Sequence, residues 1–187
     1  MKQKEVAVRQ QQQQQQTRPQ QTRPQSQQRA TQRPSQTTQG QEKTVLEFYH
    51  SANGGGKFKK LTLTVSQRGG VILRLSEKRE DGVKSIVFSL SRTELITLSR
   101  ELEFYLMGVA NSTPKEGGRA SVVELFHANK NGQYKKLAVE IFKDGGIALV
   151  LRQGEKGTPA DGIVFALSRA ETIHLMEELR LLFYRRV

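Results

Sequence analysis

The chain contains an internal repeat, because the stretch from residue 45 to 107 recurs from residue 122 to 184. Residues 58–61 (FKKL) correspond to residues 134–137 (YKKL), and the offset between matched positions stays at 76 or 77 residues. Chance would not hold one register over that length. The sequence therefore predicts a duplicated structural unit, in which both copies fold in the same way.

Each repeat predicts four strands followed by one helix. In the first repeat, strands are expected around residues 45–50, 60–65, 71–75 and 85–90, where apolar residues recur at every second position. The period then changes to that of a helix at Ser91, which forms a capping box with Glu94. Ser168 and Glu171 repeat this box in the second copy. The expected fold class is α+β, with two tandem ββββα repeats.

The domain organisation follows from the repeat boundaries. We expect repeat 1 over residues 43–107, a linker over 108–120 and repeat 2 over 121–187. A unit of about 60 residues buries little apolar surface alone. We therefore expect the two repeats to pack their helices and inner sheet faces together, as one folded pseudo-twofold domain over residues 43–187.

Residues 1–42 are predicted to be a disordered, basic, Gln-rich tail. They hold seventeen glutamines and almost no apolar residues, so burial cannot offset the entropy lost on ordering. Seven basic residues against two acidic ones make this tail positive. It is either a low-complexity extension without a function or a tether whose arginines add weak phosphate contacts.

The charge of the chain favours a polyanionic partner. The formal net charge is +12, and both the tail and the remaining residues are basic. There is no cysteine, which excludes disulfides and thiolate metal sites. The sequence shows no signal peptide and no apolar run long enough to span a membrane, so we expect an intracellular protein with no membrane partner.

The residues that enzymes use are sparse here. His50 and His127 occupy matched strand positions and are interpreted as structural, while His174 has no counterpart in repeat 1. Neither a metal-ligand spacing nor a nucleophile beside a base is present. We expect no catalytic residues, no metal and no cofactor, and hence a protein that is not an enzyme.

Strand alternation predicts an outer sheet face that combines aromatic and basic residues. The side chains expected on this face are Tyr49, Phe58, Lys60, Thr62, Thr64, Ile72 and Arg74 in repeat 1, and Phe126, Tyr134, Lys136, Ala138, Glu140, Ala148, Val150 and Arg152 in repeat 2. Exposed rings can stack on unpaired bases, and neighbouring cations neutralise phosphates. In the alternative interpretation, Phe58 and Tyr134 cover the edge of the core and the lysines are only solvated. Glutamates at positions 47, 124 and 140 weaken the positive potential of this face.

The residues predicted to bind nucleic acid include neighbours of this face and of its turns. They are Tyr49, Phe58, Lys59, Lys60, Arg68, Arg74, Phe126, Tyr134, Lys135, Lys136, Lys143 and Arg152.

The repeat resembles the PUR (Pur-alpha-like) repeat and the related Whirly and positive-coactivator-type folds. The resemblance lies in residues 58–65, in the glycine-containing turn before residues 71–75, and in residues 88–91, which lead into the helix. It implies a domain that binds single-stranded DNA or RNA, largely without sequence preference. The alternative is a scaffold, or an accessory factor of transcription or replication, that docks a protein partner through its sheet or helix face. A homodimer of the two-repeat domain is a further partner to test.

Overall fold

The computed structural model describes residues 42–51, 56–109 and 118–185, which all belong to one compact unit. The predicted tail lies outside the described residues, except for Glu42, as does most of the predicted linker. Repeat 1 comprises β1 (Lys43–Ser51), β2 (Phe58–Val65), β3 (Val71–Arg79), β4 (Gly82–Leu90) and α1 (Arg92–Leu106). Repeat 2 comprises β5 (Arg119–Ala128), β6 (Gln133–Phe142), β7 (Ile147–Glu155), β8 (Asp161–Leu167) and α2 (Arg169–Arg185).

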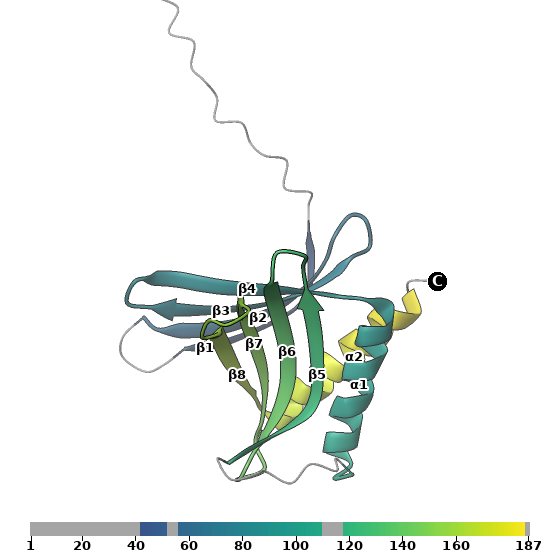
Figure 1. Ribbon diagram of the computed structural model, residues 1–187. Helices are drawn as coiled ribbons and strands as arrows, with labels where there is room; N and C mark the ends of the chain where they lie inside the picture. Colours follow the sequence, from purple (N-terminus) through teal and green to yellow (C-terminus); the bar gives the residue numbers. More distant parts are fainter. Residues whose placement is uncertain (1–41, 52–55, 110–117, 186–187) are drawn as a thin grey trace, which may run out of the picture. The chain divides into compact units, whose positions relative to one another are not determined.

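Each repeat is a four-stranded antiparallel sheet followed by a helix, which confirms the predicted ββββα unit in both copies (Figure 1). Sheet A has the order β1-β2-β3-β4, and sheet B has the order β5-β6-β7-β8. One boundary differs, because β5 begins at Arg119, within the range expected to be linker. Arg119 pairs with Phe142 at the end of the ladder, but its polar surroundings in the sequence carry no alternating apolar signal.

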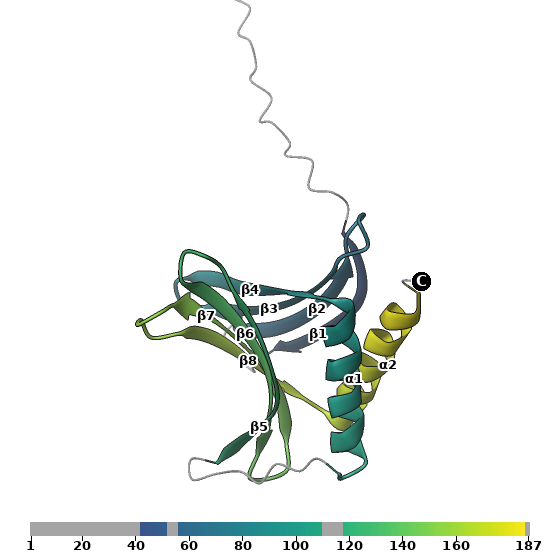
Figure 2. The same cartoon turned by 45° about the vertical axis from the view of Figure 1, so that its right-hand side comes forward.

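Both sheets carry a bulge at the same place in their first strand. The register shifts between Thr44 and Leu46 in β1 and between Ser121 and Val123 in β5. A bulge adds one residue to one strand, which bends that strand and increases its twist. Sheet B curves strongly and turns its convex side toward the helices, so that its outer face is concave (Figure 2).

The β2–β3 connection spans residues 66–70 and the β6–β7 connection residues 143–146, and each ends in the Gly-Gly pair that the sequence places before the third strand of its repeat. Gly69 and Gly145 have φ angles of 73° and 80°, values that glycine adopts without strain. In both turns a backbone amide donates to the carbonyl of the second glycine. The amide of Ser66 donates to the carbonyl of Gly70 at 2.8 Å, and that of Phe142 donates to the carbonyl of Gly146 at 2.8 Å. The positive φ explains the first glycine of each pair, and at the second an added Cβ would lie 3.0 Å from Oγ of Ser66 at Gly70 and 3.2 Å from Oδ1 of Asp144 at Gly146.

The inner sheet faces and both helices bury one continuous apolar core. Its members include Leu61, Leu73, Phe88 and Leu95 from repeat 1, and Phe165 and Leu175 from repeat 2, all fully buried. The side chains predicted for the inner face of sheet A are in this cluster or packed against it. Strand alternation therefore assigned the inner face correctly.

The two helices lie side by side (Figures 1 and 2) and contact each other through polar groups as well as apolar ones. The Ser99 hydroxyl donates to the Met176 carbonyl at 3.2 Å. Arg180 and Glu103 form an ion pair at 2.8 Å. Neither helix is long and apolar enough to cross a membrane, and the described residues contain no other.

Each repeat completes the helix cap of the other through a histidine. Nε2 of His127 donates to Oε1 of Glu94 at 2.7 Å, and Nε2 of His50 donates to Oε1 of Glu171 at 2.7 Å. Both carboxylates also belong to the capping boxes that begin α1 and α2. Each histidine ring stacks on a phenylalanine of the core. The ring centroids are 4.2 Å apart for His127 and Phe88, and 4.4 Å apart for His50 and Phe165. We call these two contacts the reciprocal His–Glu contacts.

The two capping glutamates are held in their ionised form. Burial of Glu94 on its own would raise its pKa, but hydrogen bonds from Ser91 and His127 outweigh burial and place the pKa below its ordinary value. Glu171 follows the same pattern, with Ser168 and His50 as donors. The reciprocal His–Glu contacts therefore involve two carboxylates whose ionised form the folded state favours.

Candidate nucleic-acid interface

The outer face of sheet A forms a polar groove of about 350 Å³. Hydroxyl side chains line its floor, among them Thr62, Thr64 and Ser76, and Glu42, Glu47, Lys60 and Arg74 stand around them. The groove is built by strand alternation, because every second residue of β2 and β3 points into it while the residues between them enter the core. Five of the seven side chains predicted for the outer face of repeat 1 line this groove together, namely Phe58, Lys60, Thr62, Thr64 and Arg74.

An aromatic pair stands at the same corner of each sheet. Tyr49 and Phe58 stack with ring centroids 5.4 Å apart and an interplanar angle of 28°. Phe126 and Tyr134 stack at 5.5 Å and 24°. Tyr49 is 57% exposed and Phe126 is 59% exposed, whereas the second ring of each pair is half-buried. We call these the two ring pairs.

This geometry combines features of the two sequence interpretations. Phe58 and Tyr134 are partly covered, as the interpretation with rings at the core edge expects. They also form a stacked pair with a ring that is more than half exposed. An isolated exposed phenylalanine in a protein surface needs no explanation, but the same stacked pair at matched positions of both repeats does.

The basic residues beside the ring pairs are each paired with a glutamate. Lys60 contacts Glu47 at 2.7 Å, and Lys136 contacts Glu124 at 2.6 Å in the matched position. The hydrogen bond from Lys136 keeps the pKa of Glu124 below its ordinary value, against the effect of burial. Both pairs are partly exposed, so a phosphate can compete for the ammonium group at little cost.

The arginines of this face are positioned by glutamates as well. Arg152 donates to Glu140 at 2.7 Å, and Arg119 donates to the other oxygen of the same carboxylate at 3.4 Å. Arg74 lies 3.6 Å from Glu42. Arg152 is also in register with Lys136, which in turn is in register with Phe126. One row across sheet B therefore holds a ring, an ammonium and a guanidinium.

Several small side chains expected to be exposed on this face are buried. Thr62 and Thr64 are less than a tenth exposed in sheet A, and the corresponding positions of sheet B behave alike, with Ala138 at 0% and Glu140 at 6%. Ala148 and Val150 are also buried. The expectation came from strand alternation alone, which gives the side of the sheet but neither its curvature nor its neighbours; Glu140, for example, is covered by Arg119 and Arg152, which both donate to it.

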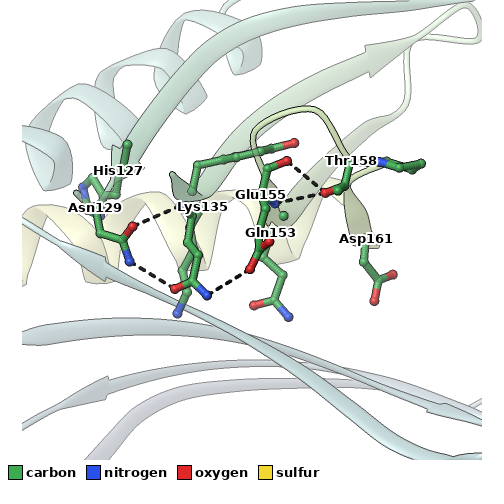
Figure 3. Close-up of a pocket in the computed structure, with 12 residues that line it drawn as sticks. His127, Asn129, Lys135, Gln153, Glu155, Thr158 and Asp161 are labelled. Carbon is green, nitrogen blue, oxygen red and sulfur yellow. Dashed lines mark hydrogen bonds between the residues drawn. The ribbon is translucent and has the colours of Figure 1, made fainter. Parts of the chain in front are cut away.

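The groove face of sheet A and the concave outer face of sheet B are together called the concave faces, and four of the predicted binding residues lie away from them. The Lys59 side chain points to the inner side, where it donates to the Val164 carbonyl at 2.9 Å. Arg68 and Lys143 are exposed in the β2–β3 and β6–β7 turns. Lys135 lines a separate cavity at the end of sheet B, shown in Figure 3. The remaining eight share the two concave faces.

Ser76 and Ser85 join the predicted Thr62 and Thr64 in the floor of the groove, and these two serines were not predicted. Ser76 and Ser85 are hydrogen-bonded through their side chains at 2.7 Å, and Thr64 donates to Glu42 at 3.3 Å. Part of the signal was present in the sequence, because threonine occupies two alternate positions of β2, Thr62 and Thr64, while β3 and β4 contribute single serines to the floor, Ser76 and Ser85. Hydroxyls both donate and accept, which suits contacts to phosphate, sugar or base edges.

The described residues contain no group of three His, Asp or Glu side chains placed to hold a metal ion. In comparisons with known proteins, no family model and no curated protein matches the chain.

Proposed function

We propose that this protein binds single-stranded DNA or RNA on the concave faces of its two sheets, without catalysing a reaction. The observation that carries the proposal is the ring pair, which occurs with an adjacent Lys–Glu pair at the same corner of both sheets. Unpaired bases stack on such rings whatever their sequence. The groove of sheet A offers hydroxyl and basic groups to the backbone of the same strand.

We also propose that the two repeats are related by a pseudo-twofold axis, as the PUR, Whirly and positive-coactivator-type folds would have it. The reciprocal His–Glu contacts support this, since each histidine uses the matched glutamate of the other repeat at the same 2.7 Å distance. Such a relation would give the protein two similar strand-binding faces, and it fits an intracellular role on exposed single strands.

A protein partner is the second candidate, and the ion pairs on the concave faces favour it. Lys60, Lys136, Arg74 and Arg152 all have a carboxylate neighbour, so these faces are less positive than their basic residues alone would make them. A mixed-charge surface of this kind suits a protein with complementary charges. The salt dependence of binding separates the candidates, because phosphate contacts weaken steeply with salt.

Removing the exposed ring of each pair tests the proposed function. Tyr49→Ala and Phe126→Ala should each weaken the binding of oligothymidylate and oligouridylate by roughly 1–3 kcal/mol, because each change removes one stacking platform. Tyr184→Ala is the matched control, since Tyr184 is an exposed ring on α2 (62%) and belongs to neither ring pair. Fluorescence anisotropy titrations, with duplex DNA as a competitor, measure these affinities. Equal affinities of all three variants and the wild type would contradict the proposal.

Deletion of residues 1–42 should weaken binding modestly and make its salt dependence less steep. The tail has a formal charge of about +5, from seven basic and two acidic residues. Apart from Glu42, which contacts Thr64 and Arg74 in the groove, it would add contacts to phosphates only. Titrations of the full chain and of the shortened chain at several salt concentrations measure both quantities. If the deletion abolished binding, the tail would be the main site and the concave faces would not.

A further inference from the structure

A cavity of about 570 Å³ lies at one end of sheet B, next to the β5–β6 turn and the β7–β8 loop (Figure 3). Asn129, Gln133, Lys135, Gln153 and Pro159 line it, together with Tyr134. Tyr134 is also the supporting ring of the second ring pair. The cavity therefore begins where the concave face of sheet B ends, and its volume is in the usual range for small-ligand sites.

The rim of the cavity is held by its own hydrogen bonds. The Asn129 amide donates to the Gln133 side chain at 3.1 Å, and the Gln133 amide donates to Glu155 at 3.3 Å. The Thr158 hydroxyl donates to the Glu155 carbonyl at 2.9 Å. Figure 3 shows this chain of contacts. A ligand would thus meet walls that are already ordered, which lowers the entropy lost on binding.

Two polar side chains in the cavity have no protein partner within the described ranges. Lys135 and Gln153 are adjacent in register, in a row that runs from His127 to Asp161. The ends of this row are engaged, since His127 bonds to Glu94 and Asp161 forms an ion pair with Lys84. Among residues 42–51, 56–109 and 118–185, neither the Lys135 ammonium nor the Gln153 amide makes a hydrogen bond or an ion pair.

The corresponding place in repeat 1 also has a cavity, of about 470 Å³, but charged residues line it, among them Lys57, Glu77 and Arg79, and its matched lysine is engaged. Lys59, which matches Lys135, lies 3.6 Å from Glu77 and donates to the Val164 carbonyl at 2.9 Å. Gln153 stands where repeat 1 has Glu77. This change removes the carboxylate partner of the lysine and leaves a neutral amide in its place. The site is thus a difference between two otherwise matched repeats.

We infer that this cavity, here called the base pocket, receives one nucleobase of a bound single strand, an inference that rests on the proposed function. A primary amide donates and accepts at once, which matches the mixed donor and acceptor edge of a base. The Lys135 ammonium can bond a base carbonyl or the adjacent phosphate. The rings of Tyr134 and Pro159 supply apolar walls, and Tyr134 connects the pocket to the strand stacked on Phe126.

Two substitutions in the full chain test the base pocket. Gln153→Glu restores the residue of repeat 1 and gives Lys135 a carboxylate partner, and Lys135→Gln removes the ammonium. Each should weaken the binding of a mixed-sequence single-stranded oligonucleotide about tenfold, the effect of losing roughly one base contact. Lys130→Gln is the matched control, since Lys130 is exposed in the neighbouring turn and does not line the pocket. It should change affinity by no more than about twofold.

Abasic oligonucleotides and free nucleotides separate the possible outcomes. A single abasic site is placed at each position of the oligonucleotide in turn. At one position it should weaken binding to the wild type more than it weakens binding to the Gln153→Glu variant, which has already lost the base contact. If the pocket variants bind like the wild type while Tyr49→Ala and Phe126→Ala bind weakly, the base pocket is wrong and the proposed function stands. If the four nucleoside monophosphates bind the wild type but no oligonucleotide does, the pocket takes free nucleotides and both the strand inference and the proposed function fail.

Discussion

Expressed alone, residues 43–107 should fail to form a stable monomer. The core is one cluster to which both repeats contribute, so separation would expose Phe88, Leu95 and their neighbours to water. It would also leave His50 without Glu171. We expect either aggregation or a homodimer, in which Glu94 of a second copy takes the place of Glu171.

Analytical ultracentrifugation and circular dichroism measure this outcome. The complete segment 43–187 is the control and should unfold in one cooperative transition. Addition of separately produced repeat 2 should convert the repeat 1 species into a complex of both. A monomeric repeat 1 that melts cooperatively would show that each ββββα unit is stable on its own, and the shared core would then not be required for folding.

Replacement of both capping glutamates should produce the second large effect. Glu94→Gln combined with Glu171→Gln should lower the free energy of unfolding near neutral pH by about 1.5–3 kcal/mol for each contact, the usual range for a hydrogen bond to a charged group. Both carboxylates are less than a fifth exposed, so solvent screens these contacts weakly. Glu177→Gln, at an exposed position of α2, is the control and should have little effect.

The same variant should respond less to acid than the wild type. The folded-state pKa values of Glu94 and Glu171 are lowered. Their stabilising contribution is therefore fully present above the unfolded-state pKa of about 4.3, and it is lost as the pH falls through the lower folded-state values. Denaturation curves from neutral pH downward should converge for the variant and the wild type at the acid end. Parallel curves over the whole range would show that these carboxylates do not stabilise the fold by their charge.

The sequence carried enough information for the elements of the fold. A period of two residues was visible in the strands, and Ser91 with Glu94 marked the start of a helix that was repeated in the second copy. Strand alternation also placed Leu61 and Leu73 in the core. The bulges in β1 and β5 could not be located in the sequence. An inserted residue interrupts the alternation of apolar residues, but the pattern does not show which residue is the extra one. The curvature to which they contribute and the burial of Ala138 and Ala148 could not be predicted.

The candidate site was predicted in part. Alternation brought Tyr49, Phe58 and Lys60 to one face, and the structure places them together there. It could not reveal that Tyr49 and Phe58 stack, since the register between β1 and β2 sets their distance. Lys59 is among the predicted binding residues because it adjoins Lys60 in the sequence. Neighbours in a strand point to opposite faces, however, so the Lys59 side chain lies on the inner side. The base pocket depends on two connections that meet only after folding.

The reciprocal His–Glu contacts constrain how the two halves of this chain can change over time. A substitution at His50 affects Glu171, which lies 121 positions away, and leaves the nearer Glu94 with its own partner. Compensating changes must therefore occur in the opposite copy of the duplication. The two copies can diverge elsewhere, as Gln153 and Glu77 already show. At the four positions of these contacts, however, each histidine can change only together with the glutamate of the other copy.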